Sequence, residues 1–335
     1  MYSYCRVIVD DFWTFQTYRE WSDQFRGQRL VNLDIRCKPG GAVFLPWPMK
    51  AKSLNVLTVE GCLIKGYFAE FMNETLYPDS MRILKMRNCV IQVDINQLIE
   101  RSFLLDQVSR SYDCGQETLV MNVVTNITYL FHPMERVEFD LLSAAFDALV
   151  KHNHNSKYRC QYKNLRTLEQ TISNTRSKLF FENLAESSEY PRLKFLNLSA
   201  NSIPYTSKFL RNWSKYFPVL EELDLSHNDI ENFEFLPSAD SRTKPLLINL
   251  QFNKIRKVPD TILNELKGNS PVIVDLRNNP IDCRFCSSRL LKTYLQEVVT
   301  MDSSHGDLQD VKCNFPPSLK GTRVMELPKN QFCTL

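Results

Sequence analysis

The sequence lacks the features that mark several large classes of protein. No apolar run in its 335 residues approaches the ~18 residues that a membrane-spanning helix needs, so we expect no direct membrane insertion. The N-terminus has neither the basic segment nor the apolar core of a signal peptide, which implies that a secreted form of the chain is a processed one. The net charge is only +3, with both signs spread along the chain, and this gives no electrostatic reason to expect nucleic-acid binding.

Signatures of catalysis and of metal binding are also missing. The sequence has no glycine-rich phosphate loop, no Gly-x-Ser-x-Gly and no His-Glu-x-x-His. Only five histidines occur, and the one close pair, His152 and His154, lies in a polar stretch that we interpret as a solvated loop. We therefore expect a protein that is not an enzyme and that has no cofactor and no metal site.

What the sequence does contain is an internal repeat of leucine-like residues. Residues 193–203 match the pattern LxxLxLxxNxI at every fixed position, and residues 220–230 match it again. Two further copies have proline in the first position, and two upstream copies have Cys62 and Cys89 in the asparagine position. Weaker copies complete a series with spacings of 24 to 31 residues. The predicted repeats begin at residues 30, 54, 81, 105, 134, 165, 193, 220, 245 and 271.

This repeat predicts an α/β fold, a leucine-rich-repeat solenoid shaped as a curved horseshoe with a parallel sheet on its concave side. Alternate strand residues point to opposite faces, so the fixed apolar positions enter the core. One repeat cannot bury its apolar face alone, and stacked coils make the core continuous. The asparagine lies where the chain leaves the strand, and its amide satisfies backbone groups in the turn. Because cysteine is small and often buried, we expect Cys62 and Cys89 to be free thiols in the core.

Both ends of such a solenoid need a cover. Residues 1–29 are rich in aromatic side chains, and we expect them to lie as a lid across the first repeat, although the same side chains would suit a binding surface. The predicted domains are an N-terminal aromatic cap (1–29), about ten leucine-rich repeats (30–282) and a cysteine-bearing C-terminal cap (283–335).

The remaining cysteines are best explained by disulfide bonds. We expect Cys5 to pair with Cys37 and Cys114 to pair with Cys160. The C-terminal cap has a Cys-x-x-Cys pair, followed by two more separate cysteines. A four-cysteine zinc site would want a second close pair, and a thioredoxin-like site would need a lowered thiol pKa, so both are weaker interpretations. The four cap cysteines are Cys283, Cys286, Cys313 and Cys333.

The repeats and the cap cysteines together resemble the extracellular leucine-rich-repeat proteins, including the ectodomains of Toll-like receptors. The resemblance is strong over residues 193–335 and weaker over residues 30–192. It implies a receptor-type role in innate immunity and two cap disulfides, Cys283–Cys313 and Cys286–Cys333. Two residues separate the first two cap cysteines where the family usually has one, and Tyr294 is the residue nearest to the tryptophan usual in the cap helix.

The expected compartment follows from the cysteines, since disulfides persist in oxidising surroundings. Four Asn-x-Ser/Thr sequons are candidates for N-glycosylation. We expect an extracellular protein, either secreted or the ectodomain of a membrane protein whose anchor is not in this chain. The sequons are Asn73, Asn126, Asn197 and Asn212.

Outward strand positions form rows across the concave sheet. The predicted central row passes Lys85, Ser109, Glu138 and Glu169 in that order. Such side chains often only face solvent, but charged and aromatic residues are also the types that select and anchor protein partners. The candidate ligand-binding residues are Lys85, Arg87, Glu138, Asp140, Glu169, Phe195, Asp224 and Phe252.

We therefore expect an extracellular recognition module that binds a protein ligand or co-receptor through its concave face. A structural adhesion or extracellular-matrix protein with the same fold is the alternative, and a cytosolic scaffold with ten free thiols is a third interpretation. The sequence leaves open whether the chain forms a homodimer.

Overall fold

The chain divides into two compact units, each of which is described by itself. Unit 1 comprises Met1–Lys194 with Tyr216–Val219, and unit 2 comprises Phe195–Lys215 with Leu220–Leu335. The computed structural model describes residues 2–24, 30–46, 53–66, 81–94, 120–130, 160–162, 164–172, 188–206, 213–233, 245–266, 272–284, 287–301 and 307–328.

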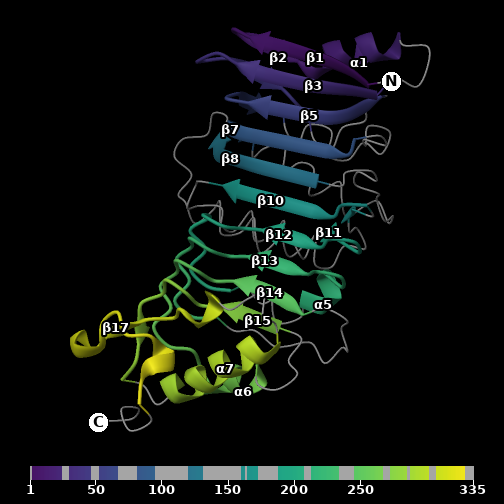
Figure 1. The fold of residues 1–335 in the computed structure, drawn as a ribbon. Helices are drawn as coiled ribbons and strands as arrows, with labels where there is room; N and C mark the ends of the chain where they lie inside the picture. Colours follow the sequence, from purple (N-terminus) through teal and green to yellow (C-terminus); the bar gives the residue numbers. More distant parts are fainter. Residues whose placement is uncertain are drawn as a thin grey trace. The chain divides into compact units, whose positions relative to one another are not determined.

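Unit 1 is built on a row of parallel strands that lie side by side in chain order (Figure 1). Because neighbouring strands run in the same direction, the chain must travel back around a coil between them. This is the connectivity of a solenoid. The strands of this row are β1 (Tyr2–Val9), β3 (Leu30–Cys37), β5 (Leu54–Glu60), β7 (Ile83–Asp94), β8 (Val120–Leu130) and β10 (Thr167–Ile172).

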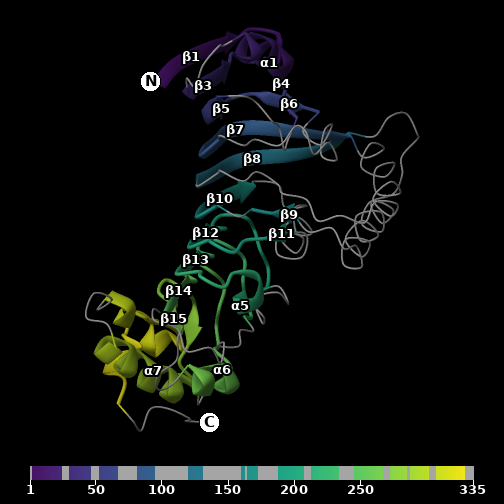
Figure 2. The ribbon, with the colours of Figure 1, turned by 90° about the vertical axis from the view of Figure 1, so that its right-hand side faces the viewer.

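A second, shorter row of parallel strands lies on the return path of the first coils (Figure 2). A helix follows the first of these strands, and the Thr14 hydroxyl at its start accepts the backbone N–H of Gln16. Phe15 and Tyr18 of this helix are buried in the end of the core. The elements are β2 (Phe12–Thr14), α1 (Phe15–Asp23), β4 (Ala42–Phe44) and β6 (Leu63–Lys65), with a separate pair formed by β9 (Cys160–Gln161) and β11 (Ser188–Glu189).

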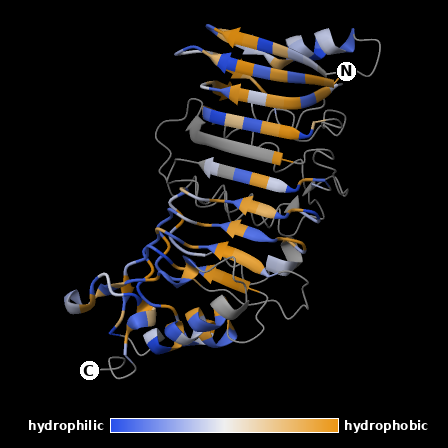
Figure 3. Ribbon diagram, viewed as in Figure 1, coloured by the Kyte–Doolittle hydropathy of each residue, from blue (hydrophilic) through white to orange (hydrophobic). Residues whose placement is uncertain are grey.

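Apolar side chains at alternating strand positions form the core of unit 1. Leu33 and Ile35 of β3 are buried, and so are Leu57 and Val59 of β5. Figure 3 shows the resulting mixture of apolar and polar residues along β1, β3, β5 and β7. Burial of one such side chain contributes ~1.5–3 kcal/mol, so each coil is stabilised mainly by the coil stacked against it.

Unit 2 has the same design with shorter strands. The residues Leu196, Leu223, Ile248 and Val274 are aligned on neighbouring strands, in the register that the repeat pattern predicts. The predicted α/β leucine-rich-repeat solenoid is confirmed. The elements are β12 (Phe195–Asn197), α5 (Trp213–Tyr216), β13 (Glu222–Asp224), β14 (Leu246–Asn249), α6 (Asp260–Glu265) and β15 (Val272–Asp275).

Buried asparagines close the turns of unit 2. The side-chain oxygen of Asn228 accepts the backbone N–H groups of Asn201 and Ile203 at 2.9 and 3.0 Å. Its amide donates to the carbonyls of Leu198 and Leu225 at 3.0 and 2.9 Å. One side chain thus binds its own coil and the preceding one. The same arrangement recurs at Asn253 and Asn279.

The N-terminal segment differs from the expected aromatic lid. β1 pairs with β3 along its whole length, from Tyr2 opposite Leu30 to Val9 opposite Cys37. Residues 2–24 therefore form a coil with its own strand instead of lying across the first repeat. The physical reason is local: the segment from Tyr2 to Val9 is rich in aromatic and β-branched residues, which favour a strand.

The predicted register between residues 105 and 164 is wrong. β8 pairs with β7 on one side and with β10 on the other, which leaves no place in the row for two strands from repeats beginning at 105 and 134. The residues at both of those predicted starts lie outside the described residues.

The cysteines of unit 1 also pair differently from the prediction. Cys37 is joined to Cys62, with their Cα atoms 5.0 Å apart, and Cys5 is free. Cys5 lies opposite Leu33, four residues before Cys37, and four strand residues span ~13 Å, beyond the reach of a disulfide. The predictions of a Cys5–Cys37 bond and of a free Cys62 are therefore wrong. Cys89 is a buried free thiol, as expected.

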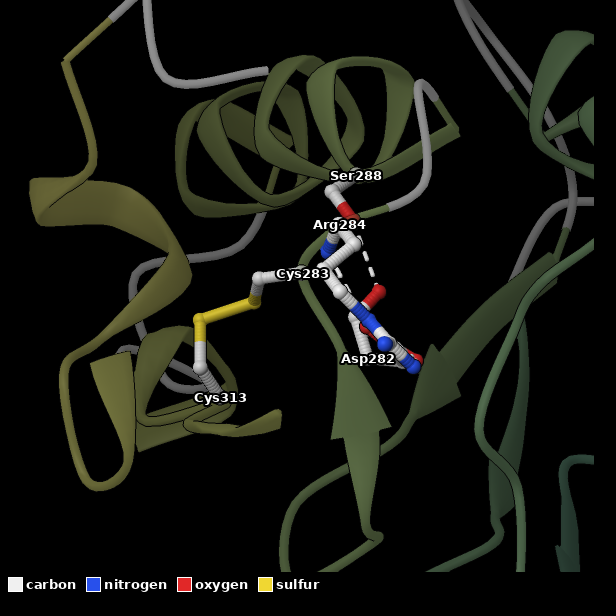
Figure 4. Close-up of a disulfide and its surroundings, with 5 residues drawn as sticks. All are labelled: Asp282, Cys283, Arg284, Ser288 and Cys313. Carbon is white, nitrogen blue, oxygen red and sulfur yellow. Dashed lines mark hydrogen bonds and ion pairs between the residues drawn. A yellow bond between two sulfur atoms is a disulfide. The ribbon is translucent and has the colours of Figure 1, made fainter. Parts of the chain in front are cut away.

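The C-terminal cap of unit 2 contains the disulfide Cys283–Cys313, the pairing that the resemblance implies (Figure 4). Arg284 forms an ion pair with Asp282 at 2.6 Å, and the Ser288 hydroxyl donates to the Asp282 carbonyl. Cys114, Cys286 and Cys333 lie outside the described residues, and the side chain of Cys160 does as well. The cap consists of β16 (Ile281–Asp282), α7 (Ser287–Met301), β17 (Cys313–Phe315), η5 (Pro317–Leu319) and η6 (Val324–Glu326).

The cap helix is tied to the last strand of unit 2 by a tyrosine. The buried hydroxyl of Tyr294 accepts the backbone N–H of Val274 at 2.7 Å. Burial raises the pKa of this hydroxyl, so it stays neutral. Tyr294 therefore fills space in the core and satisfies a backbone group of β15.

Asn228→Ala is expected to destabilise unit 2 by roughly 3 kcal/mol, because it leaves several buried backbone groups without partners. Asn249→Ala is the matched control, since the half-buried Asn249 side chain accepts the backbone N–H of Gln251 and its loss is expected to cost under ~1 kcal/mol. Urea unfolding of both variants measures the difference. Equal losses of unfolding free energy in the two variants would contradict the role assigned to Asn228.

Thiol labelling of the folded protein is expected to modify Cys5 and to spare Cys89, because burial raises the pKa of the Cys89 thiol and shields it from reagents. Cys37 and Cys62 are expected to react only after reduction. Peptide mass spectrometry after iodoacetamide treatment, with and without a reductant, checks the assignment. Labelling of Cys62 without reduction would refute the Cys37–Cys62 pairing.

Candidate recognition surface

The strand face of each unit is the set of residues at the strand positions that alternate with the core positions. In unit 1 the backbone register aligns these residues in two rows that cross all six strands. The first row is Arg6, Asp34, Thr58, Lys85, Asn122 and Glu169, and the second is Ile8, Arg36, Glu60, Arg87, Val124 and Thr171.

Three of the predicted site residues take their places in these rows. Lys85 and Arg87 lie on β7, and Glu169 lies on β10. The row position between Lys85 and Glu169 belongs to Asn122 of β8, so the predicted order through Ser109 and Glu138 is wrong. Glu138 and Asp140 themselves lie outside the described residues.

The N-terminal end of the strand face contains an ion-pair network that the sequence analysis missed. The Asp34 carboxylate accepts hydrogen bonds from the Tyr4 hydroxyl at 2.6 Å, from Arg6 Nε at 2.9 Å and from Arg36 Nε at 3.1 Å. Arg36 also approaches Glu60 at 3.6 Å. The signal was the strand-forming run around Tyr4 and Arg6, which places both side chains beside Asp34.

This network controls the ionisation of Asp34. Burial alone would raise the pKa of the carboxyl, but the hydrogen bonds from Tyr4, Arg6 and Arg36 outweigh burial and lower the pKa below its ordinary value. Asp34 therefore stays charged at neutral pH although its side chain is almost completely covered. The two arginines remain half-exposed, so the surface they present is positive.

The strand face of unit 2 is acidic and aromatic. Phe195 is 42% exposed on β12. Asp224 of β13 follows Asn197 in one row, and its carboxylate accepts the backbone N–H of Ser226 at 2.8 Å. Asp224 therefore closes its own turn, a structural role beside the predicted binding role.

Phe252 lies beside the strand face instead of on a strand. It follows the end of β14 and has a left-handed backbone, with φ of 53°. Its ring stacks on that of His227 with 4.3 Å between the centroids and 10° between the planes. At 47% exposure, the Phe252 side chain remains open to a partner.

The glycosylation sites stay predictions. Asn197 ends β12 on the strand face, where its side-chain oxygen accepts the backbone N–H of Ser199. The backbone of Asn126 lies in β8 opposite Val90. Asn73 and Asn212 lie outside the described residues.

The described residues contain no group of three or more His, Cys, Asp or Glu side chains arranged to hold a metal ion. Within the same residues, no helix has the length and apolar character needed to cross a bilayer.

Asp34→Asn is expected to destabilise the protein by roughly 1–2 kcal/mol at neutral pH, since hydrogen bonds to a charged group are lost while the arginine partners are partly screened by solvent. The folded-state pKa is lowered, so the stabilisation is present above the ordinary pKa of 3.8 and is lost as the pH falls through the folded-state value. Urea unfolding at several pH values should show that the free energies of unfolding of the wild type and of Asp34→Asn become equal at acidic pH.

The control for this pH dependence is Asp10→Asn. Asp10 pairs with Lys38 on the exposed surface, where an ion pair contributes little. The free energy of unfolding of this variant should therefore equal that of the wild type at every pH. A stability difference for Asp34→Asn that does not change with pH would show that the carboxylate charge is not responsible.

Comparison with known proteins finds local similarity to two curated proteins. No protein-family model matches it. It is 31% identical to the protein Toll of Drosophila melanogaster over 150 residues, covering 42% of this chain and 13% of Toll. It is 28% identical to the CD180 antigen of Mus musculus over 109 residues, covering 32% of this chain and 15% of CD180. The matches thus span only a small part of each curated relative.

Among solved structures, human 5T4 (Wnt-activated inhibitory factor 1, trophoblast glycoprotein) aligns with 90% of this chain and 86% of its own, at 16% identity and a TM-score of 0.45. The consensus repeats, the parallel strands of both units, the disulfide-bonded cap and the similarity to Toll and CD180 show that the chain is a leucine-rich-repeat protein similar to the extracellular receptors of that type.

Proposed function

We propose that this chain is an extracellular recognition module, a receptor ectodomain or a secreted protein, whose strand face binds a protein ligand. Two observations favour the extracellular location. The disulfides Cys37–Cys62 and Cys283–Cys313 need an oxidising compartment, and the chain is similar to Toll and CD180. Recognition is favoured over catalysis because exposed charged and aromatic side chains are gathered on the strand faces.

The observation that carries the proposal is the charged strand face of unit 1. From β1 to β7 the two rows contain four cationic side chains, Arg6, Arg36, Lys85 and Arg87, and two carboxylates, Asp34 and Glu60. Because Asp34 is already bonded to two arginines, the positive charges exceed what the face neutralises itself. A partner with acidic groups would complement it and would be steered toward it.

The test is capture of partners from extracellular fluid with the purified, disulfide-bonded chain. Wild type is compared with the double variant Lys85→Glu/Arg87→Glu and with the control Lys65→Glu. Lys65 is the exposed last residue of β6, which belongs to the shorter row of strands (β2, β4 and β6) of the same unit. We expect a partner whose capture falls at least about tenfold, equivalent to ~1.4 kcal/mol, in the double variant and is unchanged in the control. Captured proteins are identified and quantified by mass spectrometry.

If every captured protein binds the double variant as well as the wild type, the unit 1 strand face is not the ligand site. If capture falls equally in the control, the effect comes from net charge and not from this surface.

A further inference from the structure

The residue before the asparagine position of each consensus repeat has a left-handed backbone. Glycine adopts this conformation without a steric penalty and asparagine adopts it readily, but it is unfavourable for a bulky side chain. The turn therefore explains a glycine, an asparagine or a histidine at this position, and it does not explain the phenyl ring that the repeat of Phe252 places there. The residues are Gly61, Asn88, Ala200, His227, Phe252 and Asn278, with φ between 51° and 68°.

The two rings also have no role in the core. His227 is exposed, and Phe252 is 47% exposed. They stack on each other at 4.3 Å, which offsets part of the backbone cost because stacked aromatic pairs attract. This ring stack, His227 with Phe252, is thus unexplained by folding alone.

The ring stack has an open end. The backbone N–H of Ala200 donates to Ser226, and that of His227 donates to Gln251, so Ala200, His227 and Phe252 follow one another on three successive coils. Neighbouring strands are about 4.8 Å apart. One face of the His227 ring is covered by Phe252. On the preceding coil the residue aligned with His227 is Ala200, whose side chain is only a methyl group. A flat group placed over Ala200 would continue the ring stack at about the spacing of the coils.

The coil that carries His227 is strongly acidic. Residues 220–233 contain five carboxylates and neither lysine nor arginine, and residues 195–206 have no charged side chain. Lys254 of the next coil pairs with Asp229 at 2.7 Å. A cation at the open end of the ring stack would be attracted by the negative charge of this coil, to which Asp224 contributes.

We propose that the space above Ala200 receives an arginine side chain of a protein partner, which stacks on His227. A guanidinium group is flat, stays charged and stacks on aromatic faces, whereas the ammonium group of lysine is compact and more strongly hydrated. Gln251 precedes Phe252 in the chain, and the ion-paired Asp229 and Lys254 each follow one of the two rings by two residues. Polar neighbours of this kind are typical of the rim around an interface anchor. This inference rests on the proposed function in that the partner is a protein, but it concerns a different surface.

The experiment uses three blocked tripeptides, Gly-Arg-Gly, Gly-Lys-Gly and Gly-citrulline-Gly, and the full chain with isotope-labelled histidine rings. The measurement is the NMR spectrum of the histidine rings. The chain has five histidines, and the resonance that disappears in His227→Asn belongs to His227. We expect Gly-Arg-Gly to shift this resonance with a saturable dependence on peptide concentration, and to bind about threefold or more tightly than either of the other peptides. Citrulline is flat but uncharged, and lysine is charged but not flat, so each peptide removes one element of the proposal.

Ala200→Asn and Phe252→Asn separate binding from folding. Asparagine suits the left-handed position, so both variants should unfold at the same temperature as the wild type or higher. Ala200→Asn fills the space beside His227 and should abolish the response to Gly-Arg-Gly, whereas Tyr205→Ala, which removes another exposed aromatic side chain of unit 2, should leave it unchanged.

An unmoved His227 signal, an equal response to all three peptides, or an undiminished response in Ala200→Asn would each overturn the inference. None of these outcomes depends on the capture of a natural partner. The failure of this inference and the failure of the unit 1 ligand site are therefore distinguishable.

Discussion

The hydrogen bonds of one buried asparagine per coil are the constraint on which unit 2 depends. Where the chain leaves a strand and turns inward, backbone N–H and C=O groups enter a core of leucine and isoleucine side chains that cannot satisfy them. The amide of Asn228 supplies two donors and an acceptor at that point, and it bonds to the preceding coil as well as its own. The spacing of the coils, the strand register and the rows of outward side chains all follow from these bonds.

Unit 1 meets the same requirement by different means. Its asparagine positions hold Cys62, which is bonded to Cys37, and Cys89, whose thiol donates weakly to backbone carbonyls at 3.3 and 3.5 Å. In compensation two strands of its main row are long, with 12 residues in β7 and 11 in β8, against three or four in β12, β13, β14 and β15 of unit 2. Backbone ladders and a covalent link therefore do in unit 1 what amide side chains do in unit 2.

The sequence predicts this fold well wherever the turn chemistry is visible in single residues. The copies at 193, 220, 245 and 271 were placed in the observed register because asparagine and leucine each mark a definite position. The copies at 105 and 134 were misplaced, because apolar residues without a turn residue fit several registers. β1 was missed because its inward residues, Cys5 and Val7 among them, are not leucines. Lys85 and Arg87 take the row positions that their repeat predicts, and their binding role stays a prediction. The row position of Asn122 and the partners of Asp34 depend on pairings between strands that are adjacent in space but far apart in sequence.

The Cys37–Cys62 bond joins two residues 25 apart in sequence and so closes one coil into a covalent ring. A protease that cuts the chain between these two residues would not release the segment that precedes them, because the ring would open while both sides remained attached. Tension applied to the N-terminus would likewise be transmitted across the ring through sulfur, so that this coil could not be drawn out to its full length before reduction. The first part of the solenoid is thereby protected against both enzymatic and mechanical loss.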